Sequence, residues 1–158
     1  MFREMVRQKQ RLTEEECIAL LKNVMRGVLS VQGDDGYPYG LPIDHWYNED
    51  DGKLYFHSGK TGHKIDALRR NEKVSFCVYD QGFRKDGEWA LNIRSVIVFG
   101  RARIVEERER VIDITRRLSA KYTADAEYIE EEIRKYAAGT LLIEMEIEHM
   151  TGKLVNEA

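Results

Sequence analysis

The segment from Ser58 to Lys64 concentrates groups that can bind an anion. It follows the apolar residues 54–56 and precedes a short helical pattern in which Ile65 and Leu68 share one face. The first N–H groups of a helix have no intrahelical partner, and the helix dipole attracts phosphate there. Gly59 and Gly62 allow close backbone approach. Hydrogen-bond donors are supplied by Ser58, Thr61, His63 and Lys64.

This segment has two interpretations from its residues alone. The first is a phosphate-binding strand–loop–helix unit, in which Lys64 opposes the dipole at the helix start and therefore favours a bound anion. The second is an ordinary strand–turn–helix with a charged exposed face, because the spacing matches neither a Walker loop nor a dinucleotide-binding fingerprint.

Composition favours one soluble globular domain over residues 1–158. Of these, 42% are hydrophobic and 34% are charged, and the net charge of −3 gives no support for a general nucleic-acid binder. No apolar run is long enough to cross a membrane, and the charged N-terminus lacks a signal-peptide core, so a cytoplasmic location is the default expectation. No metal is expected, because Cys17 and Cys77 lie in apolar patterns and the four histidines lack metal-ligand spacing.

The elements that must position the loop are mostly short strands. Residues 1–11 are expected to form an arm, and a capping box at Thr13 and Glu16 starts a helix over 14–26 that Gly27 ends. Extended segments are expected over 28–32, 37–47, 54–57, 74–79 and 89–105, with a turn at 34–36 and a bulge or bend at Gly100. Helices are expected over 106–121 and 128–136, and a half-buried strand over 141–148. This order indicates a mainly antiparallel sheet or barrel.

Several of these segments together resemble a known family. They are residues 36–43, 52–58, 62–64, 68–71, 74–76 and 94–102. In order and spacing they are similar to the pyridoxamine 5′-phosphate oxidase-like split-barrel flavoproteins, and most of all to the 5-nitroimidazole-resistance (Nim-type) branch. The resemblance covers residues 12–105 well, and residues 148–153 also look like that branch. It implies a mainly β fold with flanking helices, a six-stranded antiparallel split β-barrel, and a homodimer with FMN at the subunit interface.

The resemblance also implies which residues contact FMN. His57 and Ser58 would touch the phosphate and ribityl chain, while His63 and Lys64, after Gly62, would hold the phosphate. Ser95 would reach the cofactor from a neighbouring strand. The flavin ring edge would be lined by the strand made of Leu41, Pro42, Ile43, Asp44 and His45.

The chain departs from the oxidase members of the family at three places. His63 replaces an arginine, so phosphate binding is expected to weaken at alkaline pH. Gly40 replaces another arginine, which removes one ionic contact. Residues 140–158 lack the Trp- and Arg-rich segment that binds the vitamin substrate, which argues against pyridoxine phosphate.

Two classes of function are compatible with this sequence. One is an FMN-dependent oxidoreductase that takes electrons from NADH or NADPH and reduces a small molecule, with nitro compounds implied by the branch and His57 as the candidate proton donor. The other is a non-catalytic flavin-binding or sensor protein, and a haem- or deazaflavin-binding split barrel is a further alternative. His57 could equally be a hydrogen-bonded barrel histidine. His45 and Trp46 could edge the flavin cleft, although strand packing is favoured, and the 106–121 helix is expected to be a lid or dimer element.

Overall fold

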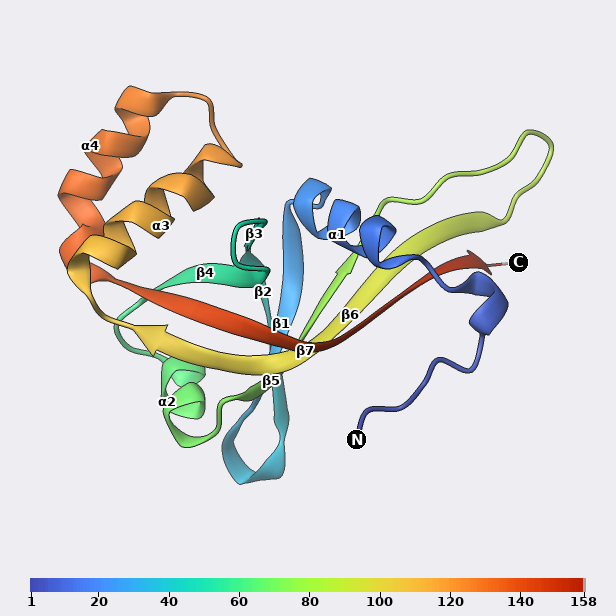
Figure 1. The fold of residues 1–158 in the computed structure, drawn as a ribbon, viewed down its shortest axis with the longest axis horizontal. Helices are drawn as coiled ribbons and strands as arrows, with labels where there is room; N and C mark the ends of the chain where they lie inside the picture. The colour runs from blue at the N-terminus through green and yellow to red at the C-terminus, as the bar shows by residue number, and fades with distance from the viewer. Residues whose placement is uncertain (158) are drawn as a thin grey trace.

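A curled antiparallel sheet forms the centre of the computed structural model, which describes residues 1–157 (Figure 1). Its seven strands lie in the order β2-β1-β5-β6-β7-β4-β3. Their bounds are β1 (Arg26–Gln32), β2 (Pro38–Asp44), β3 (Trp46–Asn48), β4 (Lys53–Gly59), β5 (Lys73–Tyr79), β6 (Leu91–Val105) and β7 (Thr140–Glu157). The expected mainly β split-barrel fold is confirmed, with seven strands rather than six.

Four helices and three short 3-10 turns flank the sheet. The helices are α1 (Glu14–Asn23), α2 (His63–Arg70), α3 (Arg108–Ala120) and α4 (Ala126–Tyr136), and the turns are η1 (Gln8–Gln10), η2 (Asp34–Gly36) and η3 (Ala137–Gly139). In Figure 1, α3 and α4 lie together beyond one end of β7, while α2 lies on the opposite side of the sheet. No helix in the part of the chain described is long and apolar enough to cross a membrane.

The longest pairing joins β6 to β7, from Leu91 opposite Glu157 to Val105 opposite Leu142. Its register shifts between Phe99 and Gly100, which confirms the expected irregularity. Gly100 is required there, because an added Cβ would lie 1.9 Å from the Glu146 carbonyl oxygen. The sheet curls enough for the edge strand β2 to approach β4, which lies next to the opposite edge, although the two strands are not paired among the described residues.

Three segment predictions need correction. The expected strand over 37–47 divides at His45 into β2 and β3, which lie at opposite edges of the sheet. α1 ends at Asn23, and Gly27 lies inside β1, where an added Cβ would meet the Phe76 ring at 2.4 Å. Gly27 therefore permits close packing rather than a helix end. β7 continues past residue 148, because pairing with β6 extends it through a polar sequence.

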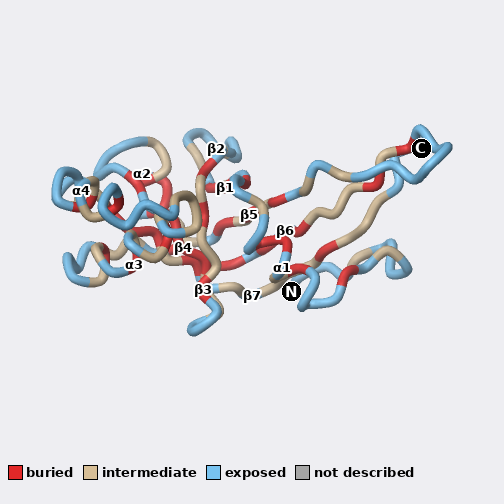
Figure 2. Tube along the Cα trace, turned by 90° about the horizontal axis from the view of Figure 1, so that it is seen from above, coloured by how far each residue is buried: buried red, intermediate tan, exposed pale blue. Residues whose placement is uncertain are grey.

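The hydrophobic core has two parts. The larger fills the curl of the sheet and includes the fully buried Phe56 and Phe76, whose rings meet edge to face with centroids 5.1 Å apart. The smaller lies between α3 and the sheet and contains Tyr55, Val111, Ile114, Leu118 and Leu142. Figure 2 shows the buried residues along the central strands and the exposed ones at the helix surfaces and loops. α3 is thereby fixed on β4 by apolar contact.

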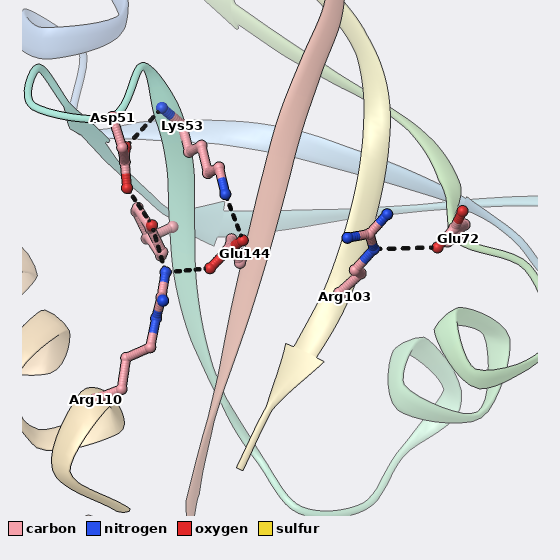
Figure 3. A network of polar contacts seen from close by, with 7 residues as sticks. Asp51, Lys53, Glu72, Arg103, Arg110 and Glu144 are labelled. Carbon is pink, nitrogen blue, oxygen red and sulfur yellow. Dashed lines mark hydrogen bonds and ion pairs between the residues drawn. The ribbon is translucent and has the colours of Figure 1, made fainter. Parts of the chain in front are cut away.

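A polar network also ties α3 to the sheet (Figure 3). Arg110 Nη2 donates to Tyr55 Oη at 3.0 Å and also to Glu144 Oε2, and Lys53 Nζ reaches Glu144 Oε1 at 2.8 Å. Tyr55 Oη donates in turn to Asp51 Oδ2. Burial is the main cause of the raised pKa of Tyr55, so its hydroxyl keeps its proton. The start of α3 is therefore held in one position relative to β4 and β7.

Candidate functional site

The connection from β4 to α2 has the geometry of an open anion cradle. β4 ends at Gly59 and α2 begins at His63, and no side chain of the described residues caps the first turn of α2. Gly62 has a φ of +134°, which side chains with a Cβ rarely adopt. A Cβ added at Gly59 or Gly62 would meet nothing within 4 Å. The first N–H groups of α2 are therefore accessible to a ligand.

Two side chains with ionisable groups lie at this edge. Lys64 is half-buried in the first turn of α2, and His57 lies near the end of β4. Although His57 is exposed as a residue, protein atoms crowd its imidazole, and this partial burial lowers its pKa. Asp44 opposes that shift, and the positive charge of Lys64 adds to it. The structure thus brings Asp44, His57 and Lys64 into electrostatic contact across β2, β4 and α2.

His63 lies on the side of the cradle that faces the β1–β2 connection. Its ring stacks on Tyr39 with centroids 4.1 Å apart, and its Nε2 is buried without a hydrogen-bond partner in the described chain. The Asp34 carboxylate lies 3.9 Å from this nitrogen but is also held by Arg70 at 2.8 Å. His63 therefore has one ring nitrogen without a partner in the described chain, and this nitrogen is packed against Gly33 rather than open to solvent.

The remaining residues expected at the cofactor adopt different orientations. Pro42 is exposed on the edge strand β2, while Ile43 is buried and Leu41 is half-buried against the main core. Asp44 is half-buried and pairs with Arg26 at 3.1 Å. Ser58 is buried, and its hydroxyl donates to the Gly59 carbonyl at 2.9 Å, so it supports the loop backbone.

His45 lies away from this surface. Its side chain is fully buried, its Nε2 lies 2.7 Å from the Leu21 carbonyl oxygen, and its ring packs edge-on against Phe76. Its backbone N–H donates to Tyr122 Oη at 2.8 Å. Burial, followed by the charge of Lys121, lowers the pKa of His45 to about 4. These contacts explain why the extended stretch divides at His45, and they agree with strand packing rather than a cleft-lining role.

Lys121, at the end of α3, also contacts the buried backbone that follows α1 and β2, and we call this contact region the His45–Lys121 joint. Its Nζ donates to the Val24 carbonyl at 2.8 Å and to the His45 carbonyl at 3.0 Å. Burial lowers the pKa of Lys121 to about 8, against an opposing effect of Asp44. The sequence pattern indicated only that α3 is amphipathic, and it contained no signal for this joint.

We expect the free energy of unfolding to rise with pH between about 8 and 9.5 because of Lys121. In this window the unfolded chain keeps the lysine proton, since its ordinary pKa is 10.5, while the folded protein loses it near pH 8. Chemical denaturation of the wild type and Lys121→Met across this range measures the effect. The wild type should gain stability relative to the variant as the pH rises, and a constant difference would contradict the prediction.

Ser95 is remote from the cradle within one chain. It lies on β6 opposite Tyr79 and Lys153, whereas Val105 of the same strand lies opposite Leu142, which pairs with His57. Ten residues of strand between Ser95 and Val105 correspond to about 33 Å. Ser95 and the cradle therefore lie at opposite ends of β6.

The outer face of the sheet exposes a set of apolar side chains near Ser95. Paired residues place Val28, Cys77, Ile97 and Thr151 in one row across β1, β5, β6 and β7. Val28 and Ile97 are 38% and 39% exposed, which is high for large apolar residues on central strands. Phe99, in the next row, is 39% exposed and stacks on Phe2 of the N-terminal arm. Contiguous exposed apolar surface of this kind is typical of a protein interface.

A cavity of about 310 Å³ lies between the helices α3 and α4 and the strand ends that carry Asp44 and His57. Its walls are largely apolar, and sequence reasoning did not identify it, because its lining comes from distant segments. The lining residues are Asp44, His57, Ile112, Thr115, Leu118, Ser119, Tyr122, Thr123, Tyr128, Ile129, Glu132, Ile133, Tyr136, Ala137 and Thr140. The sequence predicts that α3 is a lid or a dimer element, and this stays a prediction. Within one chain, α3 forms one wall of the cavity.

The sequence matches the family described as pyridoxamine 5′-phosphate oxidase over residues 13–154. Because this match spans most of the chain, the protein belongs to that family. No curated protein matches the sequence.

Solved structures share the fold at low sequence identity. A candidate 5-nitroimidazole antibiotic resistance protein from Bacteroides thetaiotaomicron VPI-5482 superposes with a TM-score of 0.76 at 19% identity, covering 92% of this chain and 87% of that one. A FAD-binding protein from Mesorhizobium loti gives a TM-score of 0.64 at 24% identity, covering 92% and 97%. A FAD- and haem-binding protein from Mycobacterium smegmatis gives 0.74 at 20% identity, covering 96% and 75%.

Proposed function

We propose that this protein binds FMN and acts as an FMN-dependent oxidoreductase. The observation that carries the proposal is the open, uncapped start of α2 beside Lys64, in a chain that belongs to the pyridoxamine 5′-phosphate oxidase family. The first N–H groups of α2, Lys64 Nζ and His63 Nε2 would hold the phosphate. Pro42 and Asp44 on the edge strand would line the ring, with Leu41, Ile43 and Ser58 supporting the backbone there.

The residues of the cradle fit a phosphate on physical grounds. His63, in the first turn of α2, leaves its Nε2 without a hydrogen-bond partner in the described chain, and a ring rotation away from Gly33 would present this nitrogen to the phosphate. Lys64 supplies a positive charge that no carboxylate of the described chain takes up as an ion pair within 4.0 Å. When bound, a flavin would supply hydride and single-electron transfer. The protein's own contribution would then be to anchor the flavin phosphate, to orient the flavin ring and to donate a proton to the substrate.

We further propose a homodimer in which Ser95 of one chain completes the flavin site of the other. The apolar outer face around Val28, Ile97 and Phe99 supports this arrangement, because it lies on the same side of the sheet as Ser95. The length of β6 between Ser95 and the cradle supports it as well, because a second copy would bring its Ser95 to the cradle of the first. For the electron donor we propose NADH or NADPH, and for the acceptor a nitro compound, as implied by the resistance protein with the same fold.

The absorption spectrum of the purified protein tests the cofactor. Two visible flavin bands, with FMN identified by mass after heat release, would support the proposal. Released FAD, released deazaflavin or a haem spectrum would identify that group as the cofactor in place of FMN. A colourless protein that fails to bind added FMN would refute it. Rapid reduction of the bound flavin by NADH or NADPH, followed by acceptor turnover, would separate an enzyme from a flavin-binding sensor.

His57→Gln tests the proposed proton donor. The variant is expected to lose turnover with a nitroaromatic acceptor by about 10²-fold or more while keeping its FMN affinity, because general acid catalysis contributes on this scale. The pKa of His57 is lowered, so the imidazolium is scarce at neutral pH and wild-type turnover should rise as the pH falls. A variant that keeps both the rate and this pH dependence would remove His57 from the reaction.

A further inference from the structure

The cavity between α3 and α4 contains a carboxylate that has no partner in the described chain. Glu132 lines the cavity, is half-buried, and forms no ion pair within 4.0 Å among the described residues. A half-buried carboxylate without a partner carries a desolvation cost that a ligand in the cavity would offset.

The charges around the cavity favour one class of ligand. Its charged and titratable lining groups are Asp44, His57 and Glu132, together with three tyrosines, and no lysine or arginine of the described residues lines it. Asp44 is already paired with Arg26, so Glu132 is the free negative charge. Lys121 lies nearby but donates to backbone carbonyls instead. The cavity therefore repels anions, including phosphate esters.

The remaining lining is suited to an apolar body. Ile112, Leu118, Ile129 and Ile133 form the walls, and Tyr128 and Tyr136 add aromatic surface. A volume of about 310 Å³ lies within the range of small-molecule sites, which begin near 300 Å³. Aromatic faces also attract cations. His57 on β4 and Asp44 on β2, the strand proposed to line the flavin ring, both line this cavity.

We propose that this cavity binds small aromatic or apolar molecules that carry one cationic nitrogen, with Glu132 as the counter-charge. The inference rests on the proposed function in one respect, namely that such a ligand beside His57 is the substrate, so that a nitro acceptor would carry the cationic nitrogen as a second group. It goes beyond that function by assigning the ligand class and the residue that selects it. Recognition of the ligand depends on the chain alone, so it can be measured with and without flavin.

The test compares three probes with the same ring and different charge: benzylamine, benzyl alcohol and benzoate. Calorimetric titration at pH 7.5, on protein with its bound flavin and on protein stripped of flavin, gives the affinities. We expect benzylamine to bind about tenfold more tightly than benzyl alcohol, and benzoate not to bind. Glu132→Gln should reduce the preference for benzylamine to within about twofold, and Glu131→Gln should leave it unchanged.

Glu131→Gln is a matched control because Glu131 lies beside Glu132 on α4, pairs with Lys135 on the surface, and does not line the cavity. Benzoate binding equal to that of benzylamine, or a preference that survives Glu132→Gln, would overturn the inference. If flavin binds but no probe does, only the ligand assignment fails. If the probes bind as expected and flavin does not, the proposed oxidoreductase fails while the ligand class stands.

Discussion

Replacing Lys64 with alanine is expected to weaken FMN binding by about 10- to 150-fold. A hydrogen bond to a charged group contributes about 1.5–3 kcal/mol, and each 1.4 kcal/mol corresponds to a tenfold change in affinity. Lys64 lies in the first turn of α2, where its charge adds to that of the free N–H groups and faces no carboxylate partner within 4.0 Å in the described chain. Flavin fluorescence titration of the stripped protein measures the change.

Two further variants make this result specific. Lys64→Arg keeps the charge and should retain most of the affinity, although the planar guanidinium of arginine differs in shape from the ammonium group of lysine. Lys73→Ala removes the same charge from the exposed start of β5, away from the cradle, and should bind FMN as the wild type does. Equal affinities for Lys64→Ala and wild type would show that the phosphate is not held at the start of α2.

Introducing a charge at Ile97 is expected to abolish both the dimer and flavin binding. Ile97→Arg would place a guanidinium in the centre of the exposed apolar row that also contains Val28 and Cys77. Burying an unpaired charge at an interface costs several kcal/mol, and each 1.4 kcal/mol weakens association about tenfold. Flavin binding should fall with it, because Ser95 of the second chain would no longer reach the cradle.

The measurement is molar mass by light scattering, together with flavin titration at the same protein concentrations. Ile97→Val, which keeps a β-branched apolar side chain, should remain dimeric and bind flavin. Circular dichroism should show both variants folded, since Ile97 is exposed in the single chain and its loss leaves no cavity in the core. A monomeric wild type that binds FMN fully would refute the shared site.

The sequence alone determined most of the local structure. The capping box at Thr13 and Glu16 starts α1 as expected, and the alternation in β5 and in the first half of β7 has the expected inward face. The strand–loop–helix around Gly62 was also predictable, because its apolar strand, its glycine- and hydroxyl-rich loop and the helical spacing of Ile65 and Leu68 follow one another within a few residues. Local patterns of this kind depend on backbone preferences and on hydrophobic period, both of which are encoded over a few residues.

The tertiary structure alone decided what lies far apart in the sequence. The division of the expected strand at His45 depends on Tyr122 and Lys121, more than 70 residues away, which take up its backbone groups. The cavity walls come from β2, β4, α3 and α4, and no local pattern indicates that Glu132 and Thr115 face the same space. Ser95 lies far from the loop with which it was grouped, because β6 is one long strand. Such positions follow from how the sheet curls and where the helices pack, and these are properties of the whole chain.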